Sequence, residues 1–167
     1  MAPRAASGRI EHEGYAMDLK GDLGMVREWR RGAYLITTDK GRLNLETIHG
    51  FLKTSYWASG IPAETVRRSV EKSLTFGLFA DEEQVGVARV VTDYATFAYL
   101  ADVFVLESHR GRGLGKWLME VVSSRPELQG LRRWMLATRD AHGLYREYGF
   151  AELENPQIFM EKYSPYE

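Results

Sequence analysis

Hydrophobic and polar positions follow two rhythms along this chain, and each rhythm predicts a type of secondary structure. Apolar, β-branched and aromatic residues fill five runs bounded by turn-forming residues, at positions 34–38, 74–80, 84–92, 97–106 and 133–138. Such runs are typical of strands. Apolar residues spaced three or four positions apart predict helices at 45–52, 62–73, 113–125 and 141–148. Residues 151–163 are expected to form one or two closing strands.

The order of these elements predicts the fold class. The strands between residues 74 and 106 are joined by short polar turns and predict an antiparallel meander. A strand-loop-helix crossover follows, and then a further strand and helix. This order indicates an α/β (α+β) fold, with a mixed, mostly antiparallel central sheet of six or seven strands flanked by about four helices.

Length and composition favour a single domain. The chain has 167 residues, of which 44% are hydrophobic, and it contains no internal repeat. A chain of this size can bury most of the surface that its unfolded form exposes. Residues 1–30 mix glycine, arginine and acidic residues with little periodicity and are expected to be a flexible N-terminal extension. The domain is therefore expected to span residues 31–167.

Charge and residue usage exclude several classes of function. The net charge is −1, but residues 110–146 contain 8 Lys and Arg against 3 Asp and Glu. A local positive excess in a nearly neutral protein favours a small polyanionic ligand over nucleic acid. The chain has no cysteine, which excludes disulfides, thiolate zinc sites and cysteine nucleophiles. Its four histidines are scattered, so we expect no metal.

The chain also lacks sequence signals for membranes and secretion. No apolar run approaches the roughly 20 residues of a membrane span. The first nine residues lack the apolar core of a secretory signal. We therefore expect a soluble, cytoplasmic protein with no membrane partner.

The strongest functional signal is the glycine-rich segment 107–116, which follows a predicted strand and opens a predicted helix. Glycines allow the main chain to turn sharply and approach an anion, to which the free amides of the first helical turn can bind. The spacing excludes the phosphate loop of nucleotide hydrolases, because three residues, not four, separate Gly111 from Gly115-Lys116, and Trp117 follows. It also excludes a dinucleotide fingerprint, whose third glycine would come one residue later. A turn that merely caps the helix needs fewer glycines.

Two motifs resemble those of one known family. The first is Arg-x-x-Gly-x-Gly, at residues 110–115, directly after the apolar strand 103–105. The second is Leu-Tyr-Arg-Glu-Tyr-Gly-Phe at residues 144–150, which is similar to a Tyr-x-x-x-Gly-Phe signature. Together, and each on its expected element, they resemble the GCN5-related N-acetyltransferase (GNAT) family over about residues 34–163. The first 30 residues lie outside the resemblance.

The resemblance implies that acetyl-CoA is the acyl donor and that CoA is the product. The main chain of Val103 and Val105 would pair with the pantetheine arm, and the amide of Val105 would polarise the thioester carbonyl. The amides from Arg110 to Lys116 would hold the pyrophosphate. The implied cofactor-binding residues are Val103, Phe104, Val105, Arg110, Gly111, Arg112, Gly113, Leu114, Gly115 and Lys116.

Two residues are the candidates for catalysis. Tyr145 has the position of the family's proton donor to the CoA sulfur, and a phenol can protonate a thiolate; packing inside the helix is the alternative. Asp102 is the one charged residue between Tyr94 and Leu106, and a carboxylate among apolar residues is costly to bury without a purpose. It is expected to bind the acceptor amine or take its proton, unless it is an edge-strand charge or a helix cap. Asp93 is expected only to form a turn.

The acceptor side is less defined. Candidate substrate-binding residues are Tyr56, Trp57, Tyr99 and His142, although core packing is equally consistent with the aromatic pair. The stretch 99–105 resembles a strand of polyamine acetyltransferases, but Ala101 replaces their second carboxylate, which argues against a polycationic acceptor. Asp140 or His142 could assist proton transfer, although Asp140 is expected to be a helix N-cap.

The resemblance therefore implies an acetyl-CoA-dependent N-acetyltransferase acting on a primary amine of a small molecule, by direct attack in a ternary complex. A protein lysine or N-terminal acetyltransferase and a non-catalytic acyl-CoA-binding regulatory module are the alternatives. A homodimer, frequent in the family, is an expectation.

Overall fold

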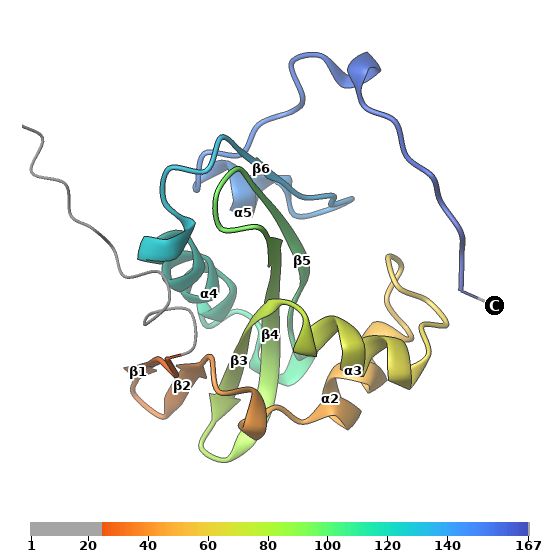
Figure 1. Cartoon of the computed structure of the whole chain (residues 1–167). Coiled ribbons are helices and arrows are strands. Elements are labelled where there is room, and N and C mark those ends of the chain that lie inside the picture. Colours follow the sequence, from red (N-terminus) through yellow and green to blue (C-terminus); the bar gives the residue numbers. More distant parts are fainter. Residues whose placement is uncertain (1–24, 167) are drawn as a thin grey trace, which may run out of the picture.

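The computed structural model describes residues 25–166 and contains one six-stranded sheet (Figure 1). The strands follow one another across the sheet in chain order, and every neighbouring pair is antiparallel except the last, β5 and β6, which is parallel. The strands are β1 (Glu28–Arg31), β2 (Tyr34–Thr37), β3 (Leu74–Ala80), β4 (Glu83–Thr92), β5 (Phe97–Val105) and β6 (Arg133–Met135). The predicted antiparallel meander and the mixed sheet are both confirmed.

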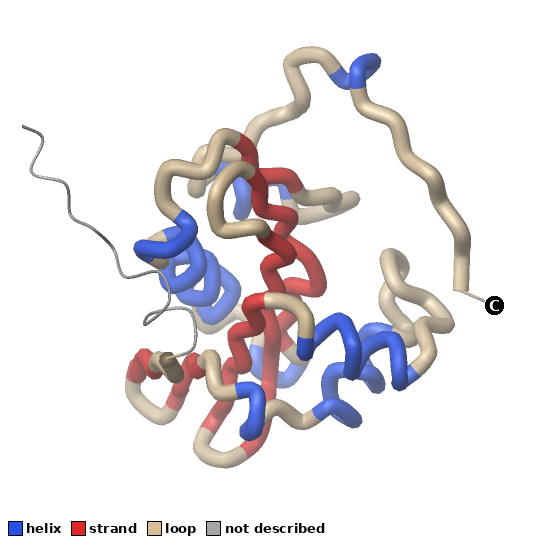
Figure 2. Tube along the Cα trace, in the orientation of Figure 1, coloured by secondary structure: helices blue, strands red, loops and turns tan. Residues whose placement is uncertain are grey.

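Helices cover both faces of the sheet (Figures 1 and 2). They are α2 (Leu45–Leu52), α3 (Ala63–Glu71), α4 (Leu114–Ser123) and α5 (His142–Arg146). Helix α4 buries its apolar stripe in the larger core cluster, together with the inner sides of β3, β4 and β5. Helices α2 and α3 pack on the opposite face, where Val87 and Phe104, which are partners in the β4–β5 ladder, join their cluster. Burial of these two faces holds the sheet in place between the helices.

The path of β5 is irregular in two ways that matter for function. Its pairing with β4 shifts register near Val87, and opposite this shift Asp102 has a φ of +51°. Its pairing with β6 covers only the three residues from Phe97 to Tyr99. The remainder of β5 therefore has no ladder with β6, and its main chain borders the opening between the two strands.

The N-terminal edge of the sheet lies partly inside the predicted extension. Strand β1 begins at Glu28 and pairs with β2 through a turn at Gly32, whose φ is +58°. This strand is mostly charged and exposed, and its indole Trp29 lies against Phe76 at a ring-centroid distance of 6.2 Å. Apolar periodicity could not predict it, because a single apolar residue anchors it. The rest of the predicted extension, up to residue 24, lies outside the described residues.

The prediction of closing strands at residues 151–163 is wrong. This segment is irregular apart from a short 3-10 turn, η4 (Pro156–Ile158), and it runs as an arc away from the sheet (Figure 1). Its apolar residues suggested strands, but Ile158, Met160 and Tyr163 are exposed. Phe159 meets the sheet, where the Arg133 guanidinium stacks on its ring at 5.0 Å. A strand needs a neighbouring ladder for its main-chain polar groups, and no ladder forms here among the described residues.

Within residues 25–166, no helix is both long enough and apolar enough to cross a membrane.

Candidate active site

The glycine-rich segment forms an open cradle of main-chain amides at the start of α4. Gly111 and Gly113 both have a φ of +74°, and Gly113 is the residue that precedes the first turn of the helix. A Cβ atom added to either glycine would meet nothing within 4 Å, so the space beside this main chain is free. The first amides of a helix have no intrahelical acceptor, and Gly113 supplies no capping side chain. The cradle therefore suits a phosphate or another anion.

The three cations of this segment are engaged with other parts of the protein. The Arg110 Nε donates to the Val105 carbonyl oxygen at 3.0 Å, and an Arg112 guanidinium nitrogen donates to the Tyr34 hydroxyl at 3.0 Å. The Lys116 ammonium pairs with Glu147 at 2.9 Å, and this hydrogen bond raises the lysine pKa. These pairs are largely exposed, so the cations can exchange partners at little cost.

A cleft of about 710 Å³ leads from this cradle into the opening beside β5. Val103, Val105, Arg110 and Gly115 line it on one side. Phe104 lines the cleft too, but its side chain is only 5% exposed and stacks on Phe51 with ring centroids 3.9 Å apart. The phenyl ring is thus committed to the core with α2, and Phe104 offers a ligand mainly its main chain.

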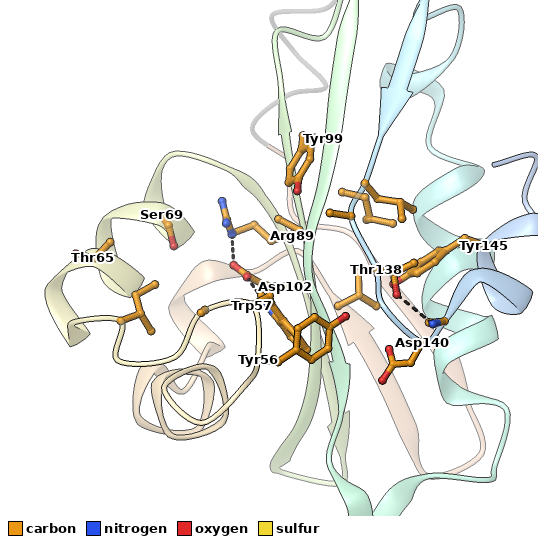
Figure 3. A pocket seen from close by; sticks show the side chains of 18 of the residues that line it. Tyr56, Trp57, Thr65, Ser69, Arg89, Tyr99, Asp102, Thr138, Asp140 and Tyr145 are labelled. Carbon is orange, nitrogen blue, oxygen red and sulfur yellow. Dashed lines mark hydrogen bonds and ion pairs between the residues drawn. The ribbon is translucent and has the colours of Figure 1, made fainter. Parts of the chain in front are cut away.

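Tyr145 lies where this cleft meets a second, smaller pocket (Figure 3). It comes from α5, is 9% exposed, and packs edge-on against Phe150 at a ring-centroid distance of 6.0 Å. Burial raises the pKa of Tyr145 to about 12, and the nearby Tyr56 and Asp140 add to the effect. The phenol is therefore protonated at neutral pH and is available as a hydrogen donor to both cavities.

The smaller pocket, called the aromatic pocket below, has a volume of about 290 Å³, and five of its 19 lining residues are aromatic. Tyr56 and Trp57 come from the segment after α2, Tyr99 comes from β5, and Tyr166 comes from the C-terminal segment. The Tyr56 hydroxyl accepts a hydrogen bond from the Arg139 amide at 2.9 Å. Tyr56 and Trp57 are about 40% exposed, so their rings border the pocket and are not buried in the core.

Asp102 lies in the wall of this pocket as one half of an ion pair. Its Oδ2 accepts from the Arg89 Nε at 2.6 Å, and its Oδ1 accepts from the Trp57 indole at 3.2 Å. The carboxylate and the guanidinium are 10% and 15% exposed, and Arg89 also donates to the Ser73 hydroxyl at 3.0 Å. The structure thus places Asp102 in a pocket wall, with its charge balanced by an arginine that the prediction did not include.

The loop before α5 differs from the expectation for Asp140. Ala141, not Asp140, is the N-cap residue, and its amide donates to the Thr138 hydroxyl at 3.1 Å. The prediction that Asp140 caps this helix is therefore wrong, and the Asp140 carboxylate borders both cavities instead. His142 lies elsewhere, in a cavity of about 390 Å³ formed with Trp134 and Phe150. Asp93 forms the expected turn, with its Oδ1 accepting from three successive amides.

Arg89 and Thr138 are the site residues that the sequence reasoning missed. A signal for Arg89 was present, because it is the one charged residue in the apolar run 84–92, as Asp102 is in its own strand. Thr138 carried no comparable signal. Among the described residues, no group of three His, Cys, Asp or Glu side chains could hold a metal ion.

Comparisons with known proteins give consistent results. The family model described as acetyltransferase (GNAT) domain matches residues 71–152. A candidate acetyltransferase from Gibberella zeae is 34% identical over an alignment of 142 residues that covers 71% of this chain and 79% of that protein. A crystal structure of a candidate GNAT acetyltransferase from Xanthomonas campestris is 52% identical, covers 80% of this chain and 94% of that chain, and has a TM-score of 0.77.

A more distant structure shares the fold alone. It is a candidate acetyltransferase from Clostridium acetobutylicum, crystallised with acetyl-CoA, and it is 11% identical to this chain. The match covers 83% of this chain and 96% of that chain, with a TM-score of 0.55.

Proposed function

Because this chain belongs to the GNAT family of acetyltransferases, we propose that it transfers the acetyl group of acetyl-CoA to a primary amine of a small molecule. The amine attacks the thioester directly while both substrates are bound. The absence of cysteine supports direct attack, because no thiol is available to carry the acetyl group. One observation carries the proposal: Tyr145 borders both the large cleft and the aromatic pocket.

The large cleft offers polar groups that suit acetyl-CoA. The amide cradle of residues 111–116 suits the diphosphate, and the unpaired part of β5 suits the amide-bearing pantetheine arm. When bound, acetyl-CoA supplies an activated acetyl group and a thiolate leaving group. The Arg110 guanidinium donates a hydrogen bond to the Val105 carbonyl oxygen. It would break this hydrogen bond when it turns toward a phosphate.

Tyr145 is proposed as the general acid that protonates the departing thiolate. Its raised pKa keeps the phenol in the protonated, hydrogen-donating form at neutral pH. Burial against Phe150 fixes the direction of the ring, so the hydroxyl is positioned before the reaction starts. These are the two requirements for a proton donor at this position.

The aromatic pocket supports a small acceptor. Its volume of about 290 Å³ is modest, and its walls come from α3, β4, β5 and the loop before α5. Aromatic faces bind an ammonium group or the apolar body of a small amine. A lysine side chain of a protein would also need an extended groove for its flanking residues.

The direct test is CoA release with a panel of small amines, amino acids and lysine-containing peptides, with products identified by mass spectrometry. We expect an N-acetylated small amine and no acetylated enzyme in the intact mass. Acetylation of peptides alone would replace the small-molecule proposal with a protein acetyltransferase. Tight acetyl-CoA binding with no acceptor in the panel would favour the regulatory module.

A further inference from the structure

Two carboxylates line the aromatic pocket, and they differ in whether their charge is already balanced (Figure 3). Asp102 receives hydrogen bonds from Arg89 and from Trp57, so both of its oxygens are engaged. Asp140 faces it across the pocket and forms no hydrogen bond or ion pair with another residue in the described range 25–166. Of these two carboxylates, Asp140 is therefore the one whose charge is free to pair with a ligand.

The local backbone explains why Asp140 is unpaired. Ala141 is the N-cap residue of α5, so Asp140 lies one position too early for its side chain to accept from the first amides of the helix. The neighbouring cation is engaged elsewhere, because the Arg139 guanidinium stacks on the Tyr56 ring at 4.0 Å. Neither the helix amides nor Arg139 therefore pairs with the Asp140 carboxylate.

Asp140 lies beside both of the cavities that are proposed to hold the reactants. Its carboxylate borders the aromatic pocket and the large cleft, as Tyr145 does. It is close enough to Tyr145 for its charge to contribute to the raised pKa of that phenol. The carboxylate is exposed in the absence of ligands, and substrates in the two cavities would exclude water from it and strengthen its interactions.

We infer that Asp140 is the binding site for the ammonium group of the acceptor and the base that receives its proton. The inference rests on the proposed acetyl transfer and assigns its substrate class: a compact monoamine whose charged nitrogen lies beside Asp140. Tyr56 and Trp57 line the same pocket, and the faces of aromatic rings attract a cation. Asp102 then has a structural role, because its ion pair with Arg89 stabilises the wall of the pocket.

The protons of this reaction balance as follows. The ammonium loses one proton to solvent through Asp140, and its nitrogen then forms a bond to the thioester carbonyl carbon. The new nitrogen–carbon bond makes the nitrogen more acidic, and a second proton passes to Asp140. The carbon–sulfur bond breaks as Tyr145 protonates the sulfur, and the proton held by Asp140 restores the phenol.

The first arm of the test measures binding without turnover. Benzylamine and benzyl alcohol, a neutral molecule of similar shape, are titrated by calorimetry into protein saturated with CoA. We expect the wild type to prefer benzylamine, and Asp140→Asn to weaken benzylamine binding about tenfold or more while the alcohol is unaffected. Asp81→Asn is the matched control, since it removes the same charge from an exposed turn between β3 and β4. Equal binding of the amine by wild type and Asp140→Asn would overturn the inference.

The second arm measures acetyl transfer with the same proteins. For benzylamine, kcat/KM of Asp140→Asn should fall about 100-fold or more, which is the usual contribution of a general base. Aniline is uncharged at neutral pH, so its acetylation should fall much less. An equal loss for both nucleophiles would reduce Asp140 to a structural role and overturn the inference. Charge-dependent benzylamine binding without any acetyl transfer would support this site and contradict the proposed function.

Discussion

The two ends of the proposed catalytic cleft are built from different parts of the chain. At the α4 end, the groups that face a ligand are main-chain amides between Gly111 and Lys116, and the nearby cations are exposed and paired elsewhere. At the other end, side chains from the α2–α3 segment, β4, β5 and the loop before α5 converge on a small aromatic pocket. One end depends on backbone conformation, and the other depends on the identity of separate side chains.

This difference explains how one fold can keep its acyl donor while it changes its acceptor. The main-chain cradle requires positive φ angles at two glycines, which a short motif supplies. The acceptor pocket requires several side chains that are distant in sequence, and each can change without disturbing the cradle. We therefore expect single side-chain substitutions to have large effects at the acceptor end and small effects at the cradle.

The largest effect is expected at Tyr145, where the two ends meet. Tyr145→Phe should lower kcat about 100- to 10,000-fold, because it removes the proposed proton donor. Acetyl-CoA affinity, measured by calorimetry, should change little. Tyr94→Phe is the control, since Tyr94 is also partly buried with a raised pKa but lies outside both cavities. A Tyr145→Phe enzyme with wild-type kcat would remove the assigned role.

The pKa of Tyr145 adds a prediction about pH. Burial, with help from Tyr56 and Asp140, raises this pKa to about 12, so the donor form persists above the ordinary phenol value of about 10. A profile of kcat should therefore show no loss from phenol ionisation below about pH 10. Spectroscopic titration of tyrosinate in the wild type and in Tyr145→Phe locates the group. Ionisation of Tyr145 near its ordinary value would contradict the buried position.

The next effect is on stability, at the ion pair in the pocket wall. Asp102→Asn should lower the free energy of unfolding by about 3 kcal/mol, because it leaves the Arg89 charge nearly buried without a partner. Asparagine tolerates the positive φ of this position, so backbone strain adds little. Denaturant unfolding measures the change, and the double variant Arg89→Met with Asp102→Asn should recover part of it. A loss no larger than that of Asp81→Asn would show that the pair is not structural.

A smaller effect is expected at the cradle itself. Gly113→Ala should weaken acetyl-CoA binding about tenfold, because its methyl group would enter the open space beside the amides and strain a φ of +74°. Gly130→Ala is matched to it, since Gly130 has the same φ and the same free space but lies in the loop between α4 and β6 and not at the start of α4. Both variants should lose similar stability, and only the first should lose affinity. Equal affinities would place the acyl donor elsewhere.

The smallest effect is expected at Lys116, whose ion pair with Glu147 is largely exposed. Lys116→Ala should weaken acetyl-CoA binding only about threefold at low salt, and the difference should shrink as salt screens the charge. Calorimetry at two ionic strengths measures both values. A loss as large as that of Gly113→Ala would mean that side-chain charge, not the main chain, dominates this end.

The parts of the fold that the sequence predicted are those with local, periodic signals. The meander and the helices α2, α3 and α4 each carry an apolar stripe that packs against the sheet. Strand β1 was missed because a single indole, Trp29, anchors a charged segment. The C-terminal strands were wrongly expected because apolar residues at 158–163 suggested a ladder, whereas pairing depends on a neighbour that the local sequence does not reveal.

The residues of the candidate site could likewise be predicted only where the sequence signal is local. The glycine motif and Tyr145 could be identified because a short segment holds each whole signal. Asp102 was identified as a lone charge, but its partner Arg89 is 13 residues away on the adjoining strand and depends on register. Asp140 was assigned to the helix cap because the residue at which α5 begins, one position later than expected, could not be placed from sequence.

Calorimetric titration of the purified protein with acetyl-CoA and with S-acetylpantetheine, which lacks the diphosphate, tests the central claim most directly. If main-chain amides at the start of α4 hold the diphosphate, acetyl-CoA binds with one site per chain and S-acetylpantetheine binds about 100-fold more weakly or not at all. Equal affinities for the two thioesters, or no heat with acetyl-CoA, would contradict the account.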